Sequence, residues 1–492
     1  MTKTLKTIAL CGAATLTVSG CMAPFDPANP GQVTQSDRQQ GAEAHPQILA
    51  EFGGAYNGPG VQMVERVGKQ MAVQSGISQT GNDCTVTYLN SSIVNAFALP
   101  GCYVYVTRGL TALMENEAQL ASVLGHEIGH VAAQHGKRRQ NASLGAGLLG
   151  VLAGVLTGSG QIAQAASQLG QVWTLKYSRD QEYQADDLGI RYMTGAGYDP
   201  YEASEVLEAL EDQSSLEAQL RGQSEASQMP AWARTHPLSA DRVQRSLAQA
   251  KATGVAPDQL AENRDQFMTS IDDTLYGDAP SQGFVRGNSF LHPTLKLGFS
   301  VPSGFYLNNS ARAVTATSGS SQTQIQFAGG SSGGNISTFA QKAVQGLLGE
   351  SAQNAQVTNV QTGTSNGMRT ATQQARVATQ SGQVDLTVVA YEFDANTAYY
   401  FAFLTPANAN DSSIINSVTQ SFRKLSNSEA AALRPRFVEV VTVGRGDTVA
   451  SLSRRMAFDN LQEQRFRVLN DLERGGDVTP GQKVKIIVER AS

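Results

Sequence analysis

The feature that most constrains this chain is a segment that places two histidines one turn apart inside an apolar helix. Residues 116–135 have the spacing of an amphipathic helix, with one side formed by Leu120, Val123, Leu124, Ile128 and Val131. His126 and His130 are four positions apart, so both imidazoles share one face of this helix and can reach one metal ion. Glu127 points to the side, where its carboxylate can contact a water molecule on the metal without being a ligand.

A third metal ligand must come from elsewhere, because catalytic zinc commonly takes three protein ligands and one water molecule. The next predicted helix, residues 177–193, carries Glu182 and Asp186 four positions apart on one face. One of these carboxylates can bind the metal while the other orients a ligand histidine. His135 follows His130 by five positions, which places it off the ligand face.

The N-terminus indicates export from the cytoplasm. Residues 1–20 combine two lysines with an apolar stretch that is too short to span a bilayer, as in a signal peptide. The sequence Val18-Ser19-Gly20-Cys21 resembles the lipobox of bacterial lipoproteins, in which the cysteine is lipidated and becomes the new N-terminus. Because Met22 follows the cysteine, resemblance to Gram-negative lipoproteins predicts a lipid anchor in the outer membrane, with the protein facing the periplasm.

Composition predicts an α+β protein of several domains. A polar tether at 21–40 precedes a mainly helical domain with a small sheet at 41–255. Residues 256–284 are predicted to be a linker, and 285–426 alternate apolar and polar residues like a mixed α/β domain. A small strand–helix–helix–strand unit is predicted at 437–489.

Charge and hydropathy exclude two classes of protein. The 492 residues carry a net charge of −5, so no basic field is available to attract nucleic acid. The sequence has no long run of large apolar residues, which excludes a polytopic membrane protein. The uncharged, glycine-rich segment 141–175 could be a membrane helix, a pair of closely packed helices or a lid. We expect a lid over the metal, because this segment joins the two ligand-bearing helices.

Two cysteines of the exported chain can meet in the small sheet. Strands are predicted at 84–90, 93–99 and 102–110, and Cys84 and Cys102 begin the first and the third. A short intervening strand could return the chain so that both cysteines lie at the same end. A disulfide and two buried thiols are both compatible with this arrangement.

The two helical motifs together resemble the gluzincin metallopeptidases of peptidase family M48, which include the CAAX prenyl endopeptidase, HtpX and periplasmic quality-control proteases. The resemblance rests on HEIGH at 126–130, SRDQEYQAD at 178–186, NAFALPGCYVYVTRGL at 95–110 and Thr235-His236-Pro237. It implies one zinc ion per chain, held by His126, His130 and Glu182. It also implies that Glu127 is the general base and that Asp186 orients a ligand.

The same resemblance implies how a polypeptide substrate is bound. An edge strand would hold the extended substrate by β-augmentation, and it is formed by Asn95, Ala96, Phe97, Ala98 and Leu99. Because transmembrane helices are missing, the resemblance is to the soluble periplasmic branch. The implied activity is a zinc endopeptidase acting on misfolded or misassembled envelope proteins.

His236 is a further candidate for the active site. Pro237 favours an extended conformation for the residue before it, so His236 is predicted on a loop. It could be a surface histidine, a fourth metal ligand that holds the enzyme inactive, or a donor to the oxyanion of the transition state. We expect the inhibitory ligand.

Residues 437–489 resemble a LysM domain in their Gly-Asp-Thr and Pro-Gly-Gln motifs and in their expected element order. That resemblance implies binding to peptidoglycan, and a unit used only for packing is the alternative. Two rival functions for the whole chain follow: a chaperone that holds envelope proteins, and a peptidoglycan-associated scaffold with a latent protease site.

Overall fold

The computed structural model describes most of the chain. The described residues are 31–136, 177–220, 232, 236, 240–318, 321–379, 382–407, 409, 411–472 and 475–491. The predictions for the signal peptide 1–20, for Cys21 and for the segment 141–175 concern residues outside these ranges. Within them, no helix is both long enough and apolar enough to cross a membrane.

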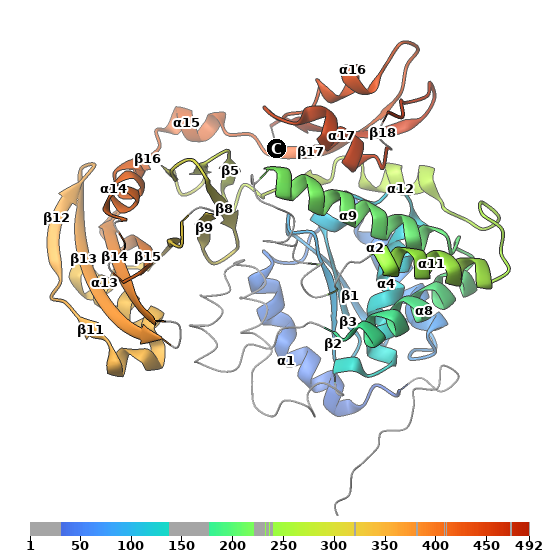
Figure 1. Ribbon diagram of the computed structural model, residues 1–492, viewed down its shortest axis with the longest axis horizontal. Helices are drawn as coiled ribbons and strands as arrows, with labels where there is room; N and C mark the ends of the chain where they lie inside the picture. Colours follow the sequence, from blue (N-terminus) through green and yellow to red (C-terminus); the bar gives the residue numbers. More distant parts are fainter. Residues whose placement is uncertain are drawn as a thin grey trace, which may run out of the picture.

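The chain forms a mixed α/β structure in several parts (Figure 1). The first part has a small sheet and helices packed around it. Its elements are α1 (Gln35–Glu51), α2 (Val61–Gln74), β1 (Thr85–Leu89), β2 (Ala96–Leu99), β3 (Tyr103–Thr107), α3 (Arg108–Thr111), α4 (Glu117–Ala132), α8 (Arg179–Gly195), α9 (Glu202–Leu220), α11 (Ala240–Ala252) and α12 (Arg264–Ile271).

The prediction of a flexible tether at 21–40 is wrong for residues 35–40, because these residues belong to helix α1. The helix begins with a capping box in which Thr34 Oγ1 accepts a hydrogen bond from the backbone N–H of Asp37, at 3.2 Å. The Asp37 carboxylate in turn accepts the N–H of Thr34, at 2.9 Å. The apolar positions of α1 are few, so its hydrophobic pattern predicts no helix before Pro46.

The small sheet has the strand order β1-β3-β2. Strands β1 and β3 run parallel, with Thr85 opposite Tyr103, whereas β2 runs antiparallel to β3. The parallel register brings Cys84 and Cys102 to the same end of the sheet. Their Cα atoms are 4.8 Å apart and a disulfide joins them.

Helix α4 is buried on almost every side, which its amphipathic spacing does not predict. Asn116 caps its N-terminus by accepting a hydrogen bond from the backbone N–H of Gln119, at 2.9 Å. Polar residues of the expected solvent face are buried and contact polar partners instead. Glu117 pairs with Arg66 and also accepts a hydrogen bond from Asn263, at 3.1 Å.

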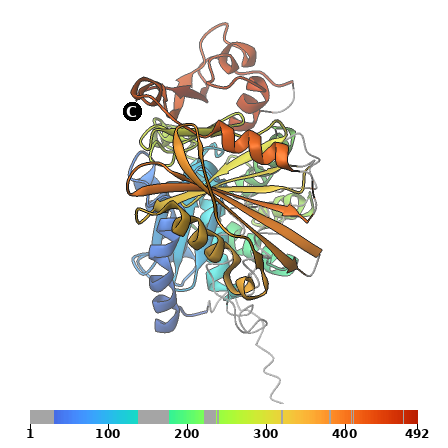
Figure 2. The same cartoon turned by 90° about the vertical axis from the view of Figure 1, so that its left-hand side faces the viewer.

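The second part is built on a large sheet with the order β11-β13-β14-β15-β10-β9-β8, to whose β13 the strand β12 also pairs. Helix α13 packs on one face of this sheet (Figure 2). An aromatic cluster around Phe299, Phe401 and Phe422 covers the other face. A smaller sheet, β16-β7-β6-β5, adjoins the aromatic cluster. The elements are β5 (Phe284–Arg286), β6 (Ser289–His292), β7 (Leu297–Ser300), β8 (Phe305–Asn309), β9 (Val314–Ser318), β10 (Gln324–Ser331), α13 (Ile336–Leu348), η2 (Gly349–Asn354), β11 (Gln356–Val357), β12 (Gln361–Ser365), β13 (Met368–Thr379), β14 (Gly382–Glu392), β15 (Thr397–Pro406), α14 (Ser412–Ser421), β16 (Arg423–Lys424) and α15 (Asn427–Ala432).

The C-terminal part packs directly on the first part (Figure 1). Its elements follow in the order β17 (Arg436–Thr442), α16 (Val449–Ser453), α17 (Gln462–Leu469) and β18 (Lys483–Glu489), with β17 and β18 antiparallel. Val438, Phe466 and Ile486 belong to the same hydrophobic core as helices α2 and α4. The LysM resemblance itself stays a prediction.

The predicted linker 256–284 is structured along much of its length. Phe267, Met268 and Ile271 of α12 are buried, and β4 (Leu275–Tyr276) extends the C-terminal sheet by pairing with β17. The linker therefore joins two parts that share one core, because its apolar side chains are buried between them.

A buried lysine fastens the C-terminal part to the turn before α4. The Lys485 ammonium is fully buried and donates hydrogen bonds to the carbonyl oxygens of Ala112 and Met114, at 3.0 and 2.6 Å. It also lies 2.8 Å from the Glu115 carboxylate. Because a buried cation is costly unless it is paired, these contacts fix how β18 sits on the first part.

We predict that the disulfide contributes about 3 kcal/mol to the free energy of unfolding, because it closes a loop with a sequence separation of 18 residues. The double variant Cys84→Ala, Cys102→Ala should unfold at lower urea concentration than the oxidised protein. Reduction of the wild type should cause a similar shift. Equal urea midpoints for the oxidised, reduced and variant proteins would contradict this stabilising role.

Glu202 predicts a pH dependence of stability. Burial, followed by the charge of Glu205, raises the pKa of Glu202 to about 8, although its carboxylate accepts a hydrogen bond from Gln119 at 2.9 Å. A carboxyl whose pKa is higher in the folded state stabilises the protein below its unfolded pKa, and this stability is lost as the pH rises through about 8.

We therefore expect the thermal midpoint of the wild type to fall between pH 5 and about 8. Glu202→Gln keeps an acceptor for Gln119 but cannot ionise, so its midpoint should fall less over the same range. The matched control is Glu211→Gln, an exposed position of the same helix. A wild-type decrease that persists in Glu202→Gln would assign it to other groups.

Candidate metal centre and active site

The candidate site lies where helices α4 and α8 touch. Glycines let the two backbones approach, since a Cβ on Gly189 would lie 3.0 Å from the backbone nitrogen of His126 and one on Gly125 would lie 3.2 Å from the Cα of Gly189. A Cβ on Gly129 would meet the carbonyl oxygen of Ala185 at 3.2 Å. Any larger residue at these positions would separate the helices and the side chains between them.

Four buried side chains from three regions of the chain converge at this contact. His126 and His130 come from α4, Glu182 comes from the first turn of α8, and His236 comes from the segment before α11. Helix α8 begins at Arg179 because Ser178 and Gln181 form a capping box, with the N–H of Gln181 donating to Ser178 Oγ at 3.3 Å.

Four of the distances between the donor atoms are close to the edge of a tetrahedron around zinc. His126 Nε2 lies 3.0 Å from His130 Nε2 and 3.1 Å from His236 Nδ1. Glu182 Oε1 lies 3.1 Å from His236 Nδ1 and 3.6 Å from His130 Nε2. Zinc–nitrogen bonds of about 2.0–2.1 Å in a tetrahedral site place neighbouring ligands about 3.3 Å apart.

The donor set fits zinc chemically as well. Three imidazoles and one carboxylate are among the ligands that zinc prefers. Two imidazole nitrogens that face each other at 3.0 Å need a proton or a cation between them. Glu182 is 1% exposed, and a buried carboxylate is stabilised by positive charge. This site can therefore hold the zinc ion expected from the sequence.

Glu127 lies beside the four donors without joining them. Its Oε1 is 3.4 Å from His236 Nε2, and it is buried with no hydrogen-bond partner among the described residues. Burial raises the pKa of Glu127, against the charges of His236 and His126, which lower it. An unpaired carboxylate oxygen beside a metal site can accept a proton from a water molecule.

Asp186 contacts His126, so it is in a position to orient this imidazole. Its Oδ1 lies 2.9 Å from His126 Nδ1, on the side of the ring away from the donor cluster. Arg242 of α11 donates two hydrogen bonds to Asp186, from Nε at 2.9 Å and from Nη2 at 2.7 Å. Burial raises the pKa of Asp186, but the charge of Arg242 and the contact with His126 lower it by more. The pKa of Asp186 is therefore lowered overall, and the carboxyl is ionised.

Arg242 also contacts the other carboxylate of α8. Its Nη1 lies 3.0 Å from Glu182 Oε2, so one buried guanidinium connects Glu182 to Asp186. Arg242 was not identified from the sequence. A signal was present, because Val243, Ser246 and Ala250 form a buried face of α11 that includes it, but an exposed arginine would have had the same pattern.

His236 is buried, which excludes the surface-loop alternative. It is 1% exposed, and its ring stacks on Trp232 with centroids 5.0 Å apart. Its backbone N–H donates to the Trp232 carbonyl at 2.8 Å. Burial lowers the pKa of His236, but the negative charges of Glu182 and Glu127 raise it by more. The pKa of His236 is therefore raised overall.

The outer histidine His135 contacts the ligand His130, although on a helical wheel it lies off the ligand face. Its Nδ1 is 2.8 Å from His130 Nδ1, and its Nε2 is 2.9 Å from Gln184 Oε1. Tyr177 stacks on the other side of His130, with ring centroids 3.8 Å apart. Neither Gln184 nor Tyr177 was identified from the sequence.

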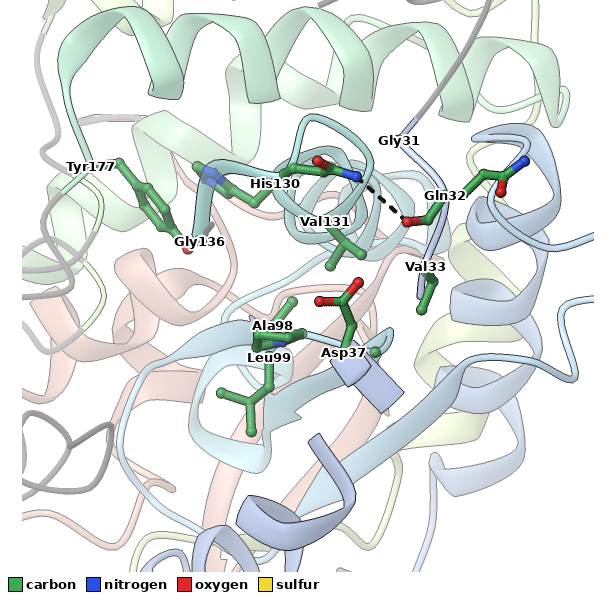
Figure 3. A pocket seen from close by; sticks show the side chains of 13 residues that line it. Gly31, Gln32, Val33, Asp37, Ala98, Leu99, His130, Val131, Gly136 and Tyr177 are labelled. Atoms are coloured by element: carbon green, nitrogen blue, oxygen red, sulfur yellow. Dashed lines mark hydrogen bonds between the residues drawn. The ribbon is translucent and has the colours of Figure 1, made fainter. Parts of the chain in front are cut away.

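A small cavity that is partly open to solvent lies beside His130 (Figure 3). The side chains of Val33, Asp37 and Val131 converge on it above Ala98 and Leu99. The predicted substrate strand β2 is the edge strand of its sheet. Among the residues described in this part of the chain, no strand pairs with the outer edge of β2.

Comparisons with known proteins agree with this geometry. The model of Peptidase family M48 matches residues 61–250. The mitochondrial metalloendopeptidase OMA1 of Schizosaccharomyces pombe is 28% identical over 42% of this chain and 59% of its own length. The beta-barrel assembly-enhancing protease of Yersinia pestis is 30% identical over 37% of each chain. Metalloprotease YcaL of Escherichia coli is 31% identical over 32% of this chain and 65% of its own.

The three relatives are matched over between 37% and 65% of their own lengths. The residues matched by the family model include all four donors, three of them on α4 and α8 and the fourth, His236, before α11. Zinc is the metal of this peptidase family, and the donor geometry fits it. Residues 61–250 of the chain are therefore a metalloprotease domain of peptidase family M48.

Proposed function

We propose that the whole protein is a zinc endopeptidase of the bacterial envelope that hydrolyses misfolded or misassembled envelope proteins. The convergence of His126, His130 and Glu182 beside a carboxylate that does not join them carries the proposal. This is the arrangement that hydrolysis of an amide requires: a metal site, with a base next to it.

The reaction would divide between the metal and Glu127. Zinc in this site would supply a Lewis acid that brings the pKa of a water molecule toward about 7. Glu127 accepts the proton of that water and returns it to the nitrogen of the leaving amine. Its burial excludes solvent from the proton that it holds, and Asp186 with Arg242 keeps His126 in a fixed orientation.

The substrate would bind as an additional strand beside β2. A main chain paired with residues 95–99 would pass in front of the donor cluster, because Ala98 and Leu99 line the same cavity as His130. Backbone pairing is independent of sequence, which suits a protease with many unfolded substrates. The cavity next to His130 offers space for a side chain of the substrate.

The envelope location rests on the N-terminal sequence and on one relative. The Val18-Ser19-Gly20-Cys21 motif supports a lipid anchor, which we place in the outer membrane. The relative named a beta-barrel assembly-enhancing protease supports substrates among envelope proteins. We propose further that residues 437–489 bind peptidoglycan, which would hold the enzyme between the outer membrane and the cell wall.

The position of His236 among the donors supports a second candidate function, in which the protein is a latent protease. A fourth protein donor in the tetrahedron would occupy the position that water needs. Its stacking on Trp232 gives this imidazole a fixed place. The protein would then bind its substrates and cleave them only after His236 has moved, and a chaperone or scaffold that cleaves little would be the limiting case.

We predict that Glu127→Gln abolishes most proteolysis without releasing zinc. Loss of the general base should lower the rate of casein hydrolysis by about 10²–10⁴-fold, while metal analysis still finds one zinc ion per chain. Glu65→Gln, at an exposed position of α2, is the control for substitution of a glutamate. Glu182→Ala should instead lose zinc.

The same variant tests the proposed substrates. Envelope proteomes from cells with wild type and with Glu127→Gln should differ in misassembled outer-membrane proteins, which should accumulate in the variant. A fully active Glu127→Gln would contradict the role of the base. Identical proteomes with an inactive variant would leave the peptidase intact but contradict the proposed substrate class.

We predict that His236→Ala increases proteolysis, because the position taken by this imidazole becomes available to water. A donor to the oxyanion would have the opposite effect, a loss of about 10²–10³-fold in rate. Initial rates of casein hydrolysis at equal zinc occupancy separate the two roles. Unchanged rates and unchanged zinc affinity would exclude both.

A further inference from the structure

We infer that His135 and Gln184 are positioning residues that fix the ring tautomer of His130, so that its Nε2 presents a lone pair to the metal. The inference rests on the proposed zinc site and assigns a role to two residues outside the donor cluster. Gln184 contacts His135, and His135 contacts the donor residue His130.

The backbone explains how a residue five positions after His130 can lie against it. Helix α4 ends at Ala132, and Gln134 then takes a left-handed conformation with φ of 53°. This turn brings His135 back toward the last helical turn, where it is fully buried. His130 and His135 then face each other through their Nδ1 atoms, at 2.8 Å.

Donors and acceptors can be assigned in order along the hydrogen-bonded series Gln184–His135–His130. The amide oxygen of Gln184 only accepts, so the Nε2 of His135, 2.9 Å away, carries a proton. A neutral imidazole has one N–H, so the Nδ1 of His135 is an acceptor. The proton between the two rings therefore belongs to the Nδ1 of His130.

The consequence for His130 is a lone pair on Nε2. That atom lies 3.0 Å from His126 Nε2 and 3.6 Å from Glu182 Oε1, inside the donor cluster. If the Gln184 amide were turned round, its NH₂ group would donate to His135, and the direction of both hydrogen bonds in the series would be reversed. His130 would then carry its proton on Nε2, where no metal could bind.

The two histidine ligands of α4 are therefore oriented by different means. His126 faces the carboxylate of Asp186 at 2.9 Å, whereas His130 faces a second imidazole. Three carboxylates are already buried around the site: Glu127, Glu182 and Asp186. An imidazole with an amide behind it fixes the tautomer of His130 without burying a fourth negative charge.

The test measures zinc affinity by competition with a chelator in His135→Leu and Gln184→Leu. We expect zinc binding about 10–100-fold weaker in both variants, the usual cost of losing an outer partner of a ligand histidine. His135→Gln supplies an amide oxygen that can accept from His130 and should recover most of the affinity. His292→Leu removes a buried imidazole from the second part of the chain and should bind zinc like the wild type.

A second measurement reads the tautomer directly. Nitrogen NMR of the zinc-loaded protein with ¹⁵N-labelled histidine should find protons on Nδ1 of His130 and on Nε2 of His135. If His135→Leu does not fold, Gln184→Leu and the NMR spectra decide. Wild-type zinc affinity in a folded His135→Leu or Gln184→Leu, or a proton on Nε2 of His130, would overturn the inference. Either result would leave the proposed peptidase standing, whereas a wild type without zinc would refute that proposal.

Discussion

The close contact between α4 and α8 is the constraint on which the active site depends. It places the carboxylate of Glu182 within 3.6 Å of two histidines that lie far from it in the sequence. The contact is this close because Gly125 and Gly189 have no Cβ atoms to keep the backbones apart. Backbone packing therefore fixes the positions of the donor side chains with the precision that a metal site needs.

Around this contact the chain distributes charge so that no carboxylate is buried alone. Arg242 connects Glu182 with Asp186, and Asp186 orients His126. Glu127 differs from these two, because its Oε1 accepts no hydrogen bond from a described residue and its ion-pair contact is His236 Nε2, at 3.4 Å. Stability favours a buried carboxylate that is paired, whereas proton transfer needs a carboxylate oxygen that is free to accept a proton. The partners of each carboxylate therefore determine which of the two roles it can have.

Much of the site could be predicted from the sequence because its main signals are local. The spacing of His126 and His130, and that of Glu182 and Asp186, follows from the period of a helix. His135 shows where this reasoning ends, since one left-handed residue after α4 changes which side chains meet. Arg242 and Trp232 were missed for a similar reason, because tertiary packing alone decides which arginine of an amphipathic helix is buried. The helical residues 35–40 were missed because a capping box, rather than an apolar face, begins α1.

The buried Lys485 limits how this protein can have changed during evolution. Its ammonium group comes from the last strand and neutralises Glu115 in the turn that leads into the metal-binding helix. The match to the peptidase family ends at residue 250, well before that strand, yet the hydrophobic core continues beyond it. Exchange of the C-terminal module for another one would remove one of the two cations that pair with Glu115, since Arg264 Nη2 also lies 2.6 Å from this carboxylate, and it would expose apolar surface of the shared core. A successful replacement would have to cover the same apolar surface and donate hydrogen bonds to the carbonyl oxygens of Ala112 and Met114, so recombination at this boundary is restricted.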